Sequence, residues 1–375
     1  MRRLAVFTAT VALALSTATA SAAAAEFTYG SWVPASDYIN SDALPEVFRR
    51  IEEDTGGEIK WNLIAGGQLA GGVETFAAIQ DGLMDAGVAA TNYVPNLLPS
   101  TATLYGLAVP GDDPVAAAGA ANEVVMLHCP SCIEETKKLN MVPMGGYASA
   151  PYMLICRDPI ETVDQLKNLR VRSSGAPLNI MQMAGANTVQ VSLIDTVSLL
   201  QRGGIDCTTG IGDWLKTFGY GDFAKNVTDF SLGVSAPIIG LMINHDVWDS
   251  FTEDQKRAHL KAVVHLSAAH TINNFIIRTN EVLEDQIANN GVKMIEPQNP
   301  EEWQALMDNF IKDQRNIAIG FAKGFGVEHP EAFLDAYDTA LVKWRGLSAK
   351  IGTDVEAFEK ALWEEVYSKV DPGSL

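Results

Sequence analysis

Two arginines and a Ser/Gly turn at residues 170–175 carry the clearest chemistry in the sequence. Arg170 and Arg172 end a short predicted strand, and the turn after them leads into a helix near Pro177. Side chains alternate along a strand, so both arginines point to the same side. A guanidinium fork followed by free backbone N–H groups and a helix N-terminus is a good carboxylate site. Two solvent-exposed arginines fit the same residue types, and the pattern alone leaves both interpretations open.

Four cysteines form the second group, namely Cys129, Cys132, Cys156 and Cys207. An even number favours disulfides in an oxidising compartment. The CxxC pair at Cys129 and Cys132 allows a redox-active or metal-binding site, or a local structural disulfide. No second CxxC or nearby His pair completes a metal site, and an Ala-rich helical segment replaces the strand that precedes a thioredoxin-like motif. We therefore expect structural disulfides, with Cys156 paired to Cys207.

Enzyme motifs are weak. His259, His265 and His270 follow one another at i, i+6 and i+11, without the i, i+4 spacing of a helical zinc pair, and we expect them on a helix surface. The sequence has no GxSxG, and the Gly-rich stretch 66–72 lacks the Lys-Ser/Thr of a phosphate loop. The sequence therefore predicts no catalytic residues, no metal and no cofactor.

The composition limits the partners. The 375 residues contain 27 Lys and Arg against 46 Asp and Glu, a formal net charge of −19, and 47% are hydrophobic. Such a chain folds as a globular protein of about two domains. The negative charge argues against nucleic acid or an anionic membrane surface as partner. An anionic ligand would then need a buried local cation.

Residues 1–25 have the pattern of a secretory signal peptide. Arg2 and Arg3 precede an apolar stretch, residues 4–15, that is too short to span a bilayer, and small residues follow at the possible cleavage sites. A membrane anchor is the rival interpretation. No later segment has 18 uncharged apolar residues, so we expect a soluble exported protein, periplasmic in a Gram-negative source.

Strand and helix patterns alternate along the remaining chain, beginning as βαβαβ, which predicts a parallel sheet covered on both faces. We expect strands at 27–33, 58–64, 85–90, 141–147, 152–156, 169–172, 188–191, 204–207, 238–244 and 292–295. Helices are expected at 38–54, 116–140, 177–184, 194–202, about 252–290, and over most of 301–375. The stretch near 252–290 exceeds the usual length of globular helices, and a helix that crosses between two lobes would explain it.

Several segments resemble one family. Leu166-Lys167-Asn168-Leu169-Arg170-Val171-Arg172 resembles the LKGxKxR signature of the TRAP transporter extracytoplasmic solute receptors, the DctP-type periplasmic substrate-binding proteins. The stretch 199–206 resembles their aLqxGxvDg pattern, and 54–59 resembles kTgGxi. Asn244, Trp248 and the long helix match the entry to their interlobe helix. The resemblance covers almost the whole chain after residue 25.

This resemblance implies a two-lobed α/β periplasmic binding protein fold, with an interlobe cleft and one long helix spanning both lobes. The first lobe would comprise 26–150 plus about 236–275, and the second 151–235 plus about 276–300. Residues 301–375 would pack on the lobes or form a homodimer interface. The lobes would close on a small organic anion and present it to TRAP membrane permease subunits. Arg172 takes the place of the arginine that pairs with the ligand carboxylate.

Two positions depart from the family pattern, because Asn168 and Cys207 stand where Gly is usual. The strand near Tyr152 also lacks the second Arg of many members, which weakens a dicarboxylate or sialic acid as ligand and leaves a small monocarboxylate or a sulfonate. Position past predicted strand ends adds further candidate pocket residues. They are Trp32, Asn92, Tyr93, Tyr152, Ser174, Gly175, Thr209 and Trp214.

Two rival functions stay open at this level. The protein could deliver its ligand to a sensor instead of a permease. It could also be a thiol-disulfide protein that uses Cys129 and Cys132.

Overall fold

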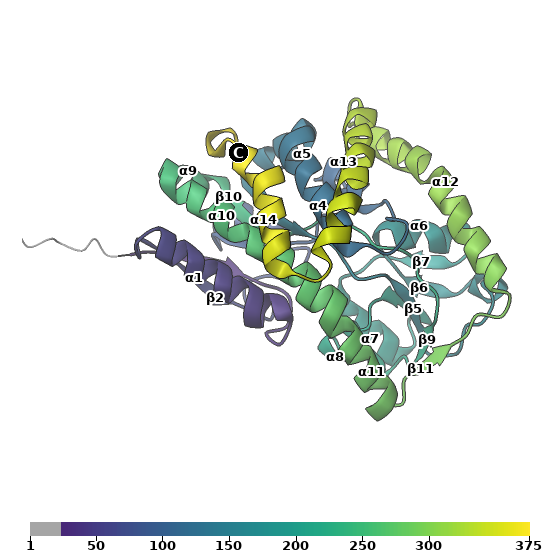
Figure 1. Cartoon of the computed structure of the whole chain (residues 1–375). Helices are drawn as coiled ribbons and strands as arrows, with labels where there is room; N and C mark the ends of the chain where they lie inside the picture. Colours follow the sequence, from purple (N-terminus) through teal and green to yellow (C-terminus); the bar gives the residue numbers. More distant parts are fainter. Residues whose placement is uncertain (1–23) are drawn as a thin grey trace, which may run out of the picture.

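Two β-sheets organise the chain in the computed structural model, which describes residues 24–375. The predicted signal peptide, 1–25, lies almost wholly outside the described residues. Figure 1 shows the two sheets in separate lobes, with helices packed around each. We call the part built on the five-stranded sheet lobe I and the part built on the six-stranded sheet lobe II. The predicted two-lobed α/β class is confirmed.

The lobe I sheet has the strand order β2-β1-β3-β10-β4. Strand β1 pairs parallel with β2 and β3, whereas β10 runs antiparallel to β3 and β4. The parallel opening follows the predicted βαβαβ pattern, and β10 enters from a distant part of the chain. The strands are β1 (Ala25–Gly30), β2 (Ile59–Ile64), β3 (Ala86–Ala89), β4 (Met141–Tyr147) and β10 (Ile238–Asn244).

The lobe II sheet has the order β11-β9-β5-β8-β6-β7. Strand β6 runs parallel to both β7 and β8, so the carboxyl ends of these three strands lie at the same edge of the sheet. The strands are β5 (Met153–Cys156), β6 (Arg170–Arg172), β7 (Asn187–Val189), β8 (Cys207–Gly210), β9 (Asn226–Thr228) and β11 (Lys293–Ile295). The short strand β9 is not among the strands expected from the sequence.

Fourteen α-helices surround the sheets within residues 24–375. In lobe I these include α1 (Leu44–Asp54), α2 (Thr75–Gln80), α3 (Pro99–Tyr105), α4 (Pro114–Glu123), α5 (Pro130–Lys138) and α9 (His245–Ser250). Lobe II contains α6 (Gly175–Met183), α7 (Leu193–Arg202) and α8 (Trp214–Thr217). The predicted helix 116–140 is interrupted at Cys129, because Pro130 cannot continue the hydrogen-bonded ladder and instead begins α5.

The long predicted helix is continuous from α10 (Glu253–Ala269) to α11 (Thr279–Asn289). Figure 1 shows it running from the side of α1 and β2 to the side of β9 and β11. Its middle nine residues, His270–Arg278, form a π-helix. Wide π-helical turns occur often at functional sites because they re-aim side chains. The expected helix spanning both lobes is confirmed, and its irregular part lies at the crossing.

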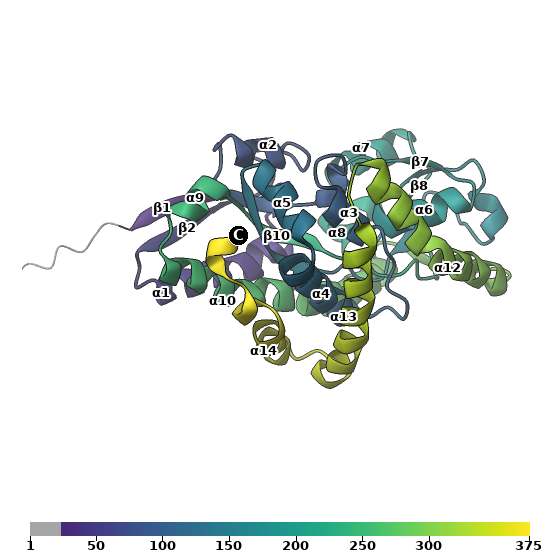
Figure 2. The same cartoon turned by 90° about the horizontal axis from the view of Figure 1, so that it is seen from above.

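The C-terminal helices pack on the body of the molecule. Helix α12 (Pro300–Gly324) lies against α3 and α6, α13 (Pro330–Ile351) against α4, and α14 (Val355–Glu365) against α10. Figure 2 shows α12 beside lobe II and α13 crossing near α4. The side chains of Trp303, Trp344 and Phe358 are fully buried. The aromatic residues of this region therefore stabilise contacts within the chain.

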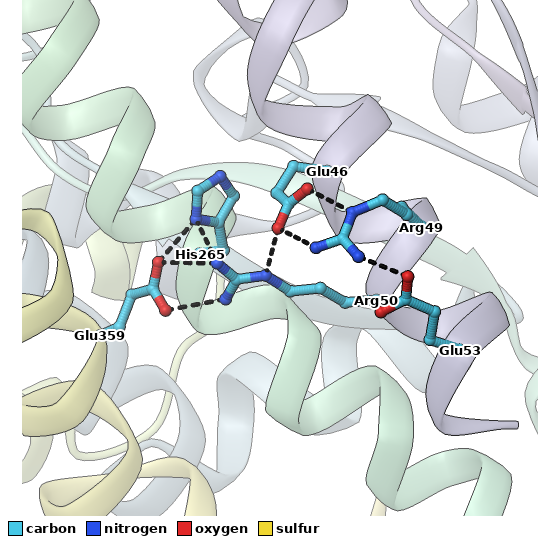
Figure 3. A network of polar contacts seen from close by, with 6 residues as sticks. All are labelled: Glu46, Arg49, Arg50, Glu53, His265 and Glu359. Carbon is cyan, nitrogen blue, oxygen red and sulfur yellow. Dashed lines mark hydrogen bonds and ion pairs between the residues drawn. The ribbon is translucent and has the colours of Figure 1, made fainter.

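A cluster of charged side chains connects α14 to α1 and α10 (Figure 3). The carboxylate of Glu359 accepts hydrogen bonds from Arg50 Nη1 at 2.7 Å and Nη2 at 3.3 Å, and lies 2.6 Å from His265 Nδ1. Arg50 also donates to Glu46 at 2.8 Å. Because Arg50 belongs to α1 and His265 to α10, one carboxylate ties three helices together.

Both predicted disulfides are present. Cys129 pairs with Cys132 at the start of α5, and Cys156 pairs with Cys207. Cys156 and Cys207 face each other in the antiparallel β5–β8 ladder, so the bond joins neighbouring strands. The departure from the family's Gly at position 207 is thereby explained.

Two local predictions are wrong. The strand expected at 204–207 begins only at Cys207, because Gly203, with φ 68°, and Gly204 complete the C-terminus of α7. Two of the three histidines expected on the helix surface are buried instead, His259 at 0% and His270 at 2% exposure, and His265 is partly buried. His259 Nδ1 donates to the Gln255 carbonyl, while its Nε2 accepts from Trp61.

Within residues 24–375, no helix is long and apolar enough to cross a membrane.

Candidate functional site

A narrow cavity of about 40 Å³ lies between the two sheets. Its walls come from both lobes and from the π-helical middle of the long helix. Six of the residues singled out from the sequence lie on these walls. The lining residues are Trp32, Val33, Asp37, Ile39, Ala90, Asn92, Tyr93, Tyr105, Tyr147, Arg172, Ser174, Leu193, Trp214, Phe218, Ile238, His270 and Phe275.

Arg172 is the only Arg or Lys on the cavity wall. Its side chain is 1% exposed, and Nε donates to the carbonyl of Val191 at 3.0 Å. Nη1 is buried without a hydrogen-bond partner, and no Asp or Glu forms an ion pair with Arg172 among the described residues. Burying an unpaired charge is costly unless a partner is supplied. The arrangement therefore fits an anionic ligand.

Arg170 has a different environment, although it shares the strand with Arg172. Its guanidinium is half-exposed and donates to Asp206 from Nε at 3.0 Å. The Asp206 carboxylate also accepts from the Arg170 backbone N–H at 2.9 Å. This pair links β6 to the segment before β8, and Arg170 thus has a structural partner where Arg172 has none.

Tyrosines surround the guanidinium of Arg172. Burial raises the pKa of Tyr93 and of Tyr152, and the positive charge of Arg172 partly offsets this rise. The hydroxyl groups therefore stay protonated. Tyr93 Oη accepts a hydrogen bond from the Leu193 N–H at 3.2 Å, which leaves its own proton free to donate. A ligand carboxylate beside Arg172 would meet at least one such O–H donor.

The turn after β6 brings lobe II against lobe I. Ser174 lies on the cavity wall, and Gly175 begins α6 with φ 63°. A Cβ on Gly175 would lie 2.5 Å from the ring of Tyr105 and 3.0 Å from its carbonyl oxygen. Only Gly permits this close approach in a left-handed conformation. Gly175 lines a separate cavity of about 100 Å³ between α3, α6 and α12.

Aromatic side chains form much of the wall. Trp32 follows β1 and donates from Nε1 to the Val88 carbonyl at 3.1 Å. Its ring packs on Tyr93, with 5.7 Å between centroids. Trp214 enters from α8, and Asn92 follows β3. These positions fit the rule that ligands lie beyond the carboxyl ends of strands.

Two residues expected in the pocket stand behind its wall. Tyr152 is 1% exposed, and its hydroxyl bonds the hydroxyl of Tyr105 at 2.6 Å, so Tyr105 faces the cavity instead. Thr209 lies within β8, and its hydroxyl bonds Ser173 at 2.8 Å. Both side chains position neighbours and neither lines the cavity.

Sequence reasoning missed the residues contributed by loops and by the π-helix. Asp37 lies in the turn after β1, and His270 and Phe275 project from the middle of the long helix. Tyr147 comes from the end of β4, where its ring lies 4.4 Å from His270 and 5.7 Å from Phe275. A continuous helical pattern gave no sign that these turns widen, so only the length of the helix pointed to a crossing.

A second ion pair lies close to the cavity. Arg278 Nε donates to Asp213 at 3.1 Å, and Nη2 donates to the carbonyl of Ser36 at 3.1 Å. Asp213 precedes α8 in lobe II, whereas Ser36 belongs to the turn after β1 in lobe I. Arg278 therefore links both lobes at the rim of the site.

The family model of the bacterial extracellular solute-binding proteins, family 7 (DctP), matches residues 29–316. The chain belongs to this family. The predicted identification as a TRAP transporter solute receptor is thus confirmed, and family 7 proteins are receptors, not enzymes. No group of three or more His, Cys, Asp or Glu that could hold a metal ion occurs within residues 24–375.

Solved structures of TRAP receptors share the fold of this family 7 chain. One from Bordetella bronchiseptica, with bound (R)- and (S)-mandelate, has a TM-score of 0.72 at 18% identity and covers 85% of this chain and 99% of its own. One from Rhodoferax ferrireducens, with copurified benzoate, has a TM-score of 0.72 at 12% identity and covers 86% and 99%. The uncharacterized protein YiiZ of Salmonella typhimurium is 26% identical over 238 residues, which is 61% of this chain and 70% of YiiZ.

Proposed function

We propose that this family 7 receptor binds a small organic anion between its lobes, with Arg172 paired to the ligand carboxylate. The observation that carries the proposal is the buried guanidinium of Arg172, whose Nη1 lacks a partner on the wall of an interlobe cavity. A carboxylate there would form a charge-assisted hydrogen bond in a site shielded from water. A sulfonate would offer the same acceptor oxygens.

The surroundings of Arg172 support a carboxylate as its partner. The protonated hydroxyl of Tyr93 can donate to a carboxylate oxygen, and Ser174 adds the start of α6 to the same wall. The narrow cavity favours a compact ligand. Similar TRAP receptors hold mandelate and benzoate, which are small carboxylates with an aromatic ring.

Binding would proceed by closure of the two lobes, which we assign to 26–150 plus about 236–275 and 151–235 plus about 276–300. Contacts across the cavity support this step, because Leu193 of lobe II donates to Tyr93 of lobe I, and Arg278 reaches Ser36. A ligand that contacts both walls shifts the equilibrium towards the closed form. The closed receptor would deliver its ligand in the periplasm, after removal of the signal peptide, to TRAP permease subunits.

Two rival functions have less support. Delivery to a sensor would use the same cavity and differ only in the partner. A thiol-disulfide activity would need an accessible sulfur, whereas Cys129 is 2% and Cys132 0% exposed. Buried disulfides exchange poorly because an attacking thiolate cannot reach them.

A thermal-shift screen of ligand-free mature protein tests the proposal. The panel contains mono- and dicarboxylates, hydroxy and keto acids, sugar acids, aromatic acids, amino acids and sulfonates. A ligand at about 100 times its Kd stabilises the folded state by about 2.7 kcal/mol, which raises Tm by several degrees. A panel in which no acid shifts Tm, on protein shown to be free of retained ligand, contradicts the proposal.

A further inference from the structure

We propose that the ligand is a zwitterion, a small amino acid, imino acid or betaine, whose carboxylate pairs with Arg172 while its positively charged nitrogen pairs with Asp37. This inference rests on the proposed function, because it retains Arg172 as the carboxylate partner. It adds a second charged contact, from lobe I. The ligand class is thereby narrowed from carboxylates and sulfonates in general to carboxylates that also carry a positive charge.

Asp37 is a buried carboxyl group on the cavity wall without a cationic partner. Its side chain is 5% exposed, and Oδ1 accepts a hydrogen bond from the Ile39 N–H at 2.9 Å. No Lys, Arg or His forms an ion pair with Asp37 within the part of the chain that the structure describes. Arg278, the neighbouring cation, is paired with Asp213 at 3.1 Å. One carboxyl oxygen of Asp37 is therefore available to a ligand.

The cavity wall carries one basic and one acidic side chain. Apart from tyrosines, the ionisable lining residues are Arg172, Asp37 and His270. Burial lowers the pKa of His270 to about 3, so its imidazole is neutral. One guanidinium and one carboxyl group, which a nearby cation would hold ionised, then face one cavity without being paired to each other. The electrostatic complement of such a wall is a ligand with one negative and one positive group.

A plain carboxylate would complement only half of this wall. It would neutralise Arg172 and leave Asp37 either charged without a partner, which is costly in a buried site, or protonated. Burial and the nearby Asp213 raise the pKa of Asp37 to about 7. A positively charged nitrogen beside Asp37 would restore the ionised carboxylate, because an opposite charge favours the charged form.

Aromatic rings add a second attraction for a cation near Asp37. Asp37 lies on the wall of the same cavity as Tyr147 and Phe275. The ring of Tyr147 stacks on Phe275, and both line the cavity. Aromatic faces attract ammonium groups by cation–π interaction. This end of the cavity therefore suits a nitrogen that is substituted or held in a ring.

The two charged groups come from different lobes. Arg172 ends β6 of the six-stranded sheet, whereas Asp37 follows β1 of the five-stranded sheet. A zwitterion would form ion pairs with both lobes at once, and a plain carboxylate with one. The second ion pair would then favour lobe closure as well as affinity.

Pairs of ligands of equal shape test the inference by calorimetric titration of the ligand-free protein. Trimethylglycine is compared with 3,3-dimethylbutanoate, and proline with cyclopentanecarboxylate. In each pair the zwitterion and the plain acid differ in the charged nitrogen. We expect at least one zwitterion to bind at least about thirtyfold more tightly than the plain acid of the same shape. A desolvated ion pair contributes about that factor or more to affinity.

The variant Asp37→Asn should reduce this preference at least tenfold, because the amide keeps the shape and the contact to Ile39 and loses the charge. Asp42→Asn is the matched control, since Asp42 is exposed in the helical turn that follows Asp37, residues 39–43, and lies outside the cavity. The Asp42→Asn variant should keep the wild-type preference for the zwitterion over the plain acid. Melting curves of the unliganded variants establish that both are folded.

Two results would overturn the inference while the proposed function stands. In one, plain carboxylates bind as tightly as their zwitterionic partners. In the other, the preference survives Asp37→Asn unchanged. If neither zwitterions nor plain carboxylates bind, the proposed function fails together with the inference.

Discussion

Arg172 and Asp37 face one cavity from different lobes, and neither side chain forms an ion pair within residues 24–375. Elsewhere on the molecule, charged side chains next to the site are paired, as Arg170 is with Asp206 and Arg278 with Asp213. The two unpaired groups are therefore a feature of the cavity. A protein that keeps such groups buried loses stability unless a ligand completes them.

Gly175 is expected to be essential to the wall that faces Tyr105. In Gly175→Ala, a Cβ at 2.5 Å from the Tyr105 ring would displace that ring and break its bond to Tyr152. We expect a loss of stability of about 1–3 kcal/mol beyond the backbone cost, and weaker ligand binding. Denaturant unfolding and ligand titration measure the two effects.

The control for this prediction is Gly56→Ala. Gly56 has a similar φ of 62°, but a Cβ there would meet no atom within 4 Å. It should show only the cost of a left-handed Ala, about 1 kcal/mol. Equal losses in both variants, with unchanged binding in Gly175→Ala, would refute the role of the Tyr105 contact.

The two disulfides should contribute unequally to stability. Cys156 and Cys207 are 51 residues apart, whereas Cys129 and Cys132 are separated by three. Loop-closure entropy predicts a loss of about 4 kcal/mol when the first pair is replaced by serine and about 2 kcal/mol for the second. Urea unfolding of the two double variants compares them. A greater loss for the Cys129/Cys132 variant would contradict this ranking.

Acid should destabilise the protein through its buried histidines. Burial lowers the pKa of His259 from 6.5 to about 4. Below pH 6.5 the unfolded chain binds a proton that the folded chain does not, so stability falls as the pH drops from about 6.5 to about 4. The difference in pKa corresponds to about 3 kcal/mol for this residue, and His270 acts in the same direction.

His259→Gln should flatten the pH dependence of the unfolding free energy over that window, even if it lowers stability at pH 7. His329→Asn, which alters an exposed histidine, should leave the slope unchanged. A slope in His259→Gln identical to that of the wild type would show that His259 does not stay neutral in the folded state.

Glu359 should stabilise the attachment of α14 (Figure 3). Burial raises the pKa of this carboxyl group, but hydrogen bonds from His265 and Arg50 outweigh burial and hold the pKa below its usual range. We expect Glu359→Gln to cost about 2 kcal/mol, as is typical of hydrogen bonds to charged groups. Glu53→Gln removes the exposed partner of Arg49 and should cost less than about 0.5 kcal/mol. Chemical denaturation of both variants is the measurement, and equal small losses would count against the role of Glu359.

The sequence predicted the parallel opening of lobe I, the crossing helix and the position of Arg172, because each follows from periodicity or from a family motif. Asn168 shows that a motif position can be met by a different residue with the same backbone conformation. It stands where the family has Gly, and its φ of 64° shows that the site requires a left-handed residue, a conformation that Asn tolerates.

Asp37 and His270 could not be predicted as cavity residues. A carboxyl in a turn carries no periodic signal, and its burial depends on packing between lobes that are distant in sequence. The π-helical turns that aim His270 and Phe275 inward arise in a segment whose pattern is ordinary for a helix. Strand β8 begins at Cys207, three residues later than expected, because Gly203 and Gly204 end helix α7.

Isothermal titration of the tightest-binding acid from the screen into wild type, Arg172→Met and Arg170→Met tests the central claim most directly. Arg170 is the matched control, since it lies two residues away on the same strand and outside the cavity. We predict that Arg172→Met weakens binding by about thirtyfold to several thousandfold, or 2–5 kcal/mol, while Arg170→Met binds within about threefold of wild type. An Arg172→Met protein that is folded and binds within threefold of wild type would contradict the assignment of Arg172 as the carboxylate partner.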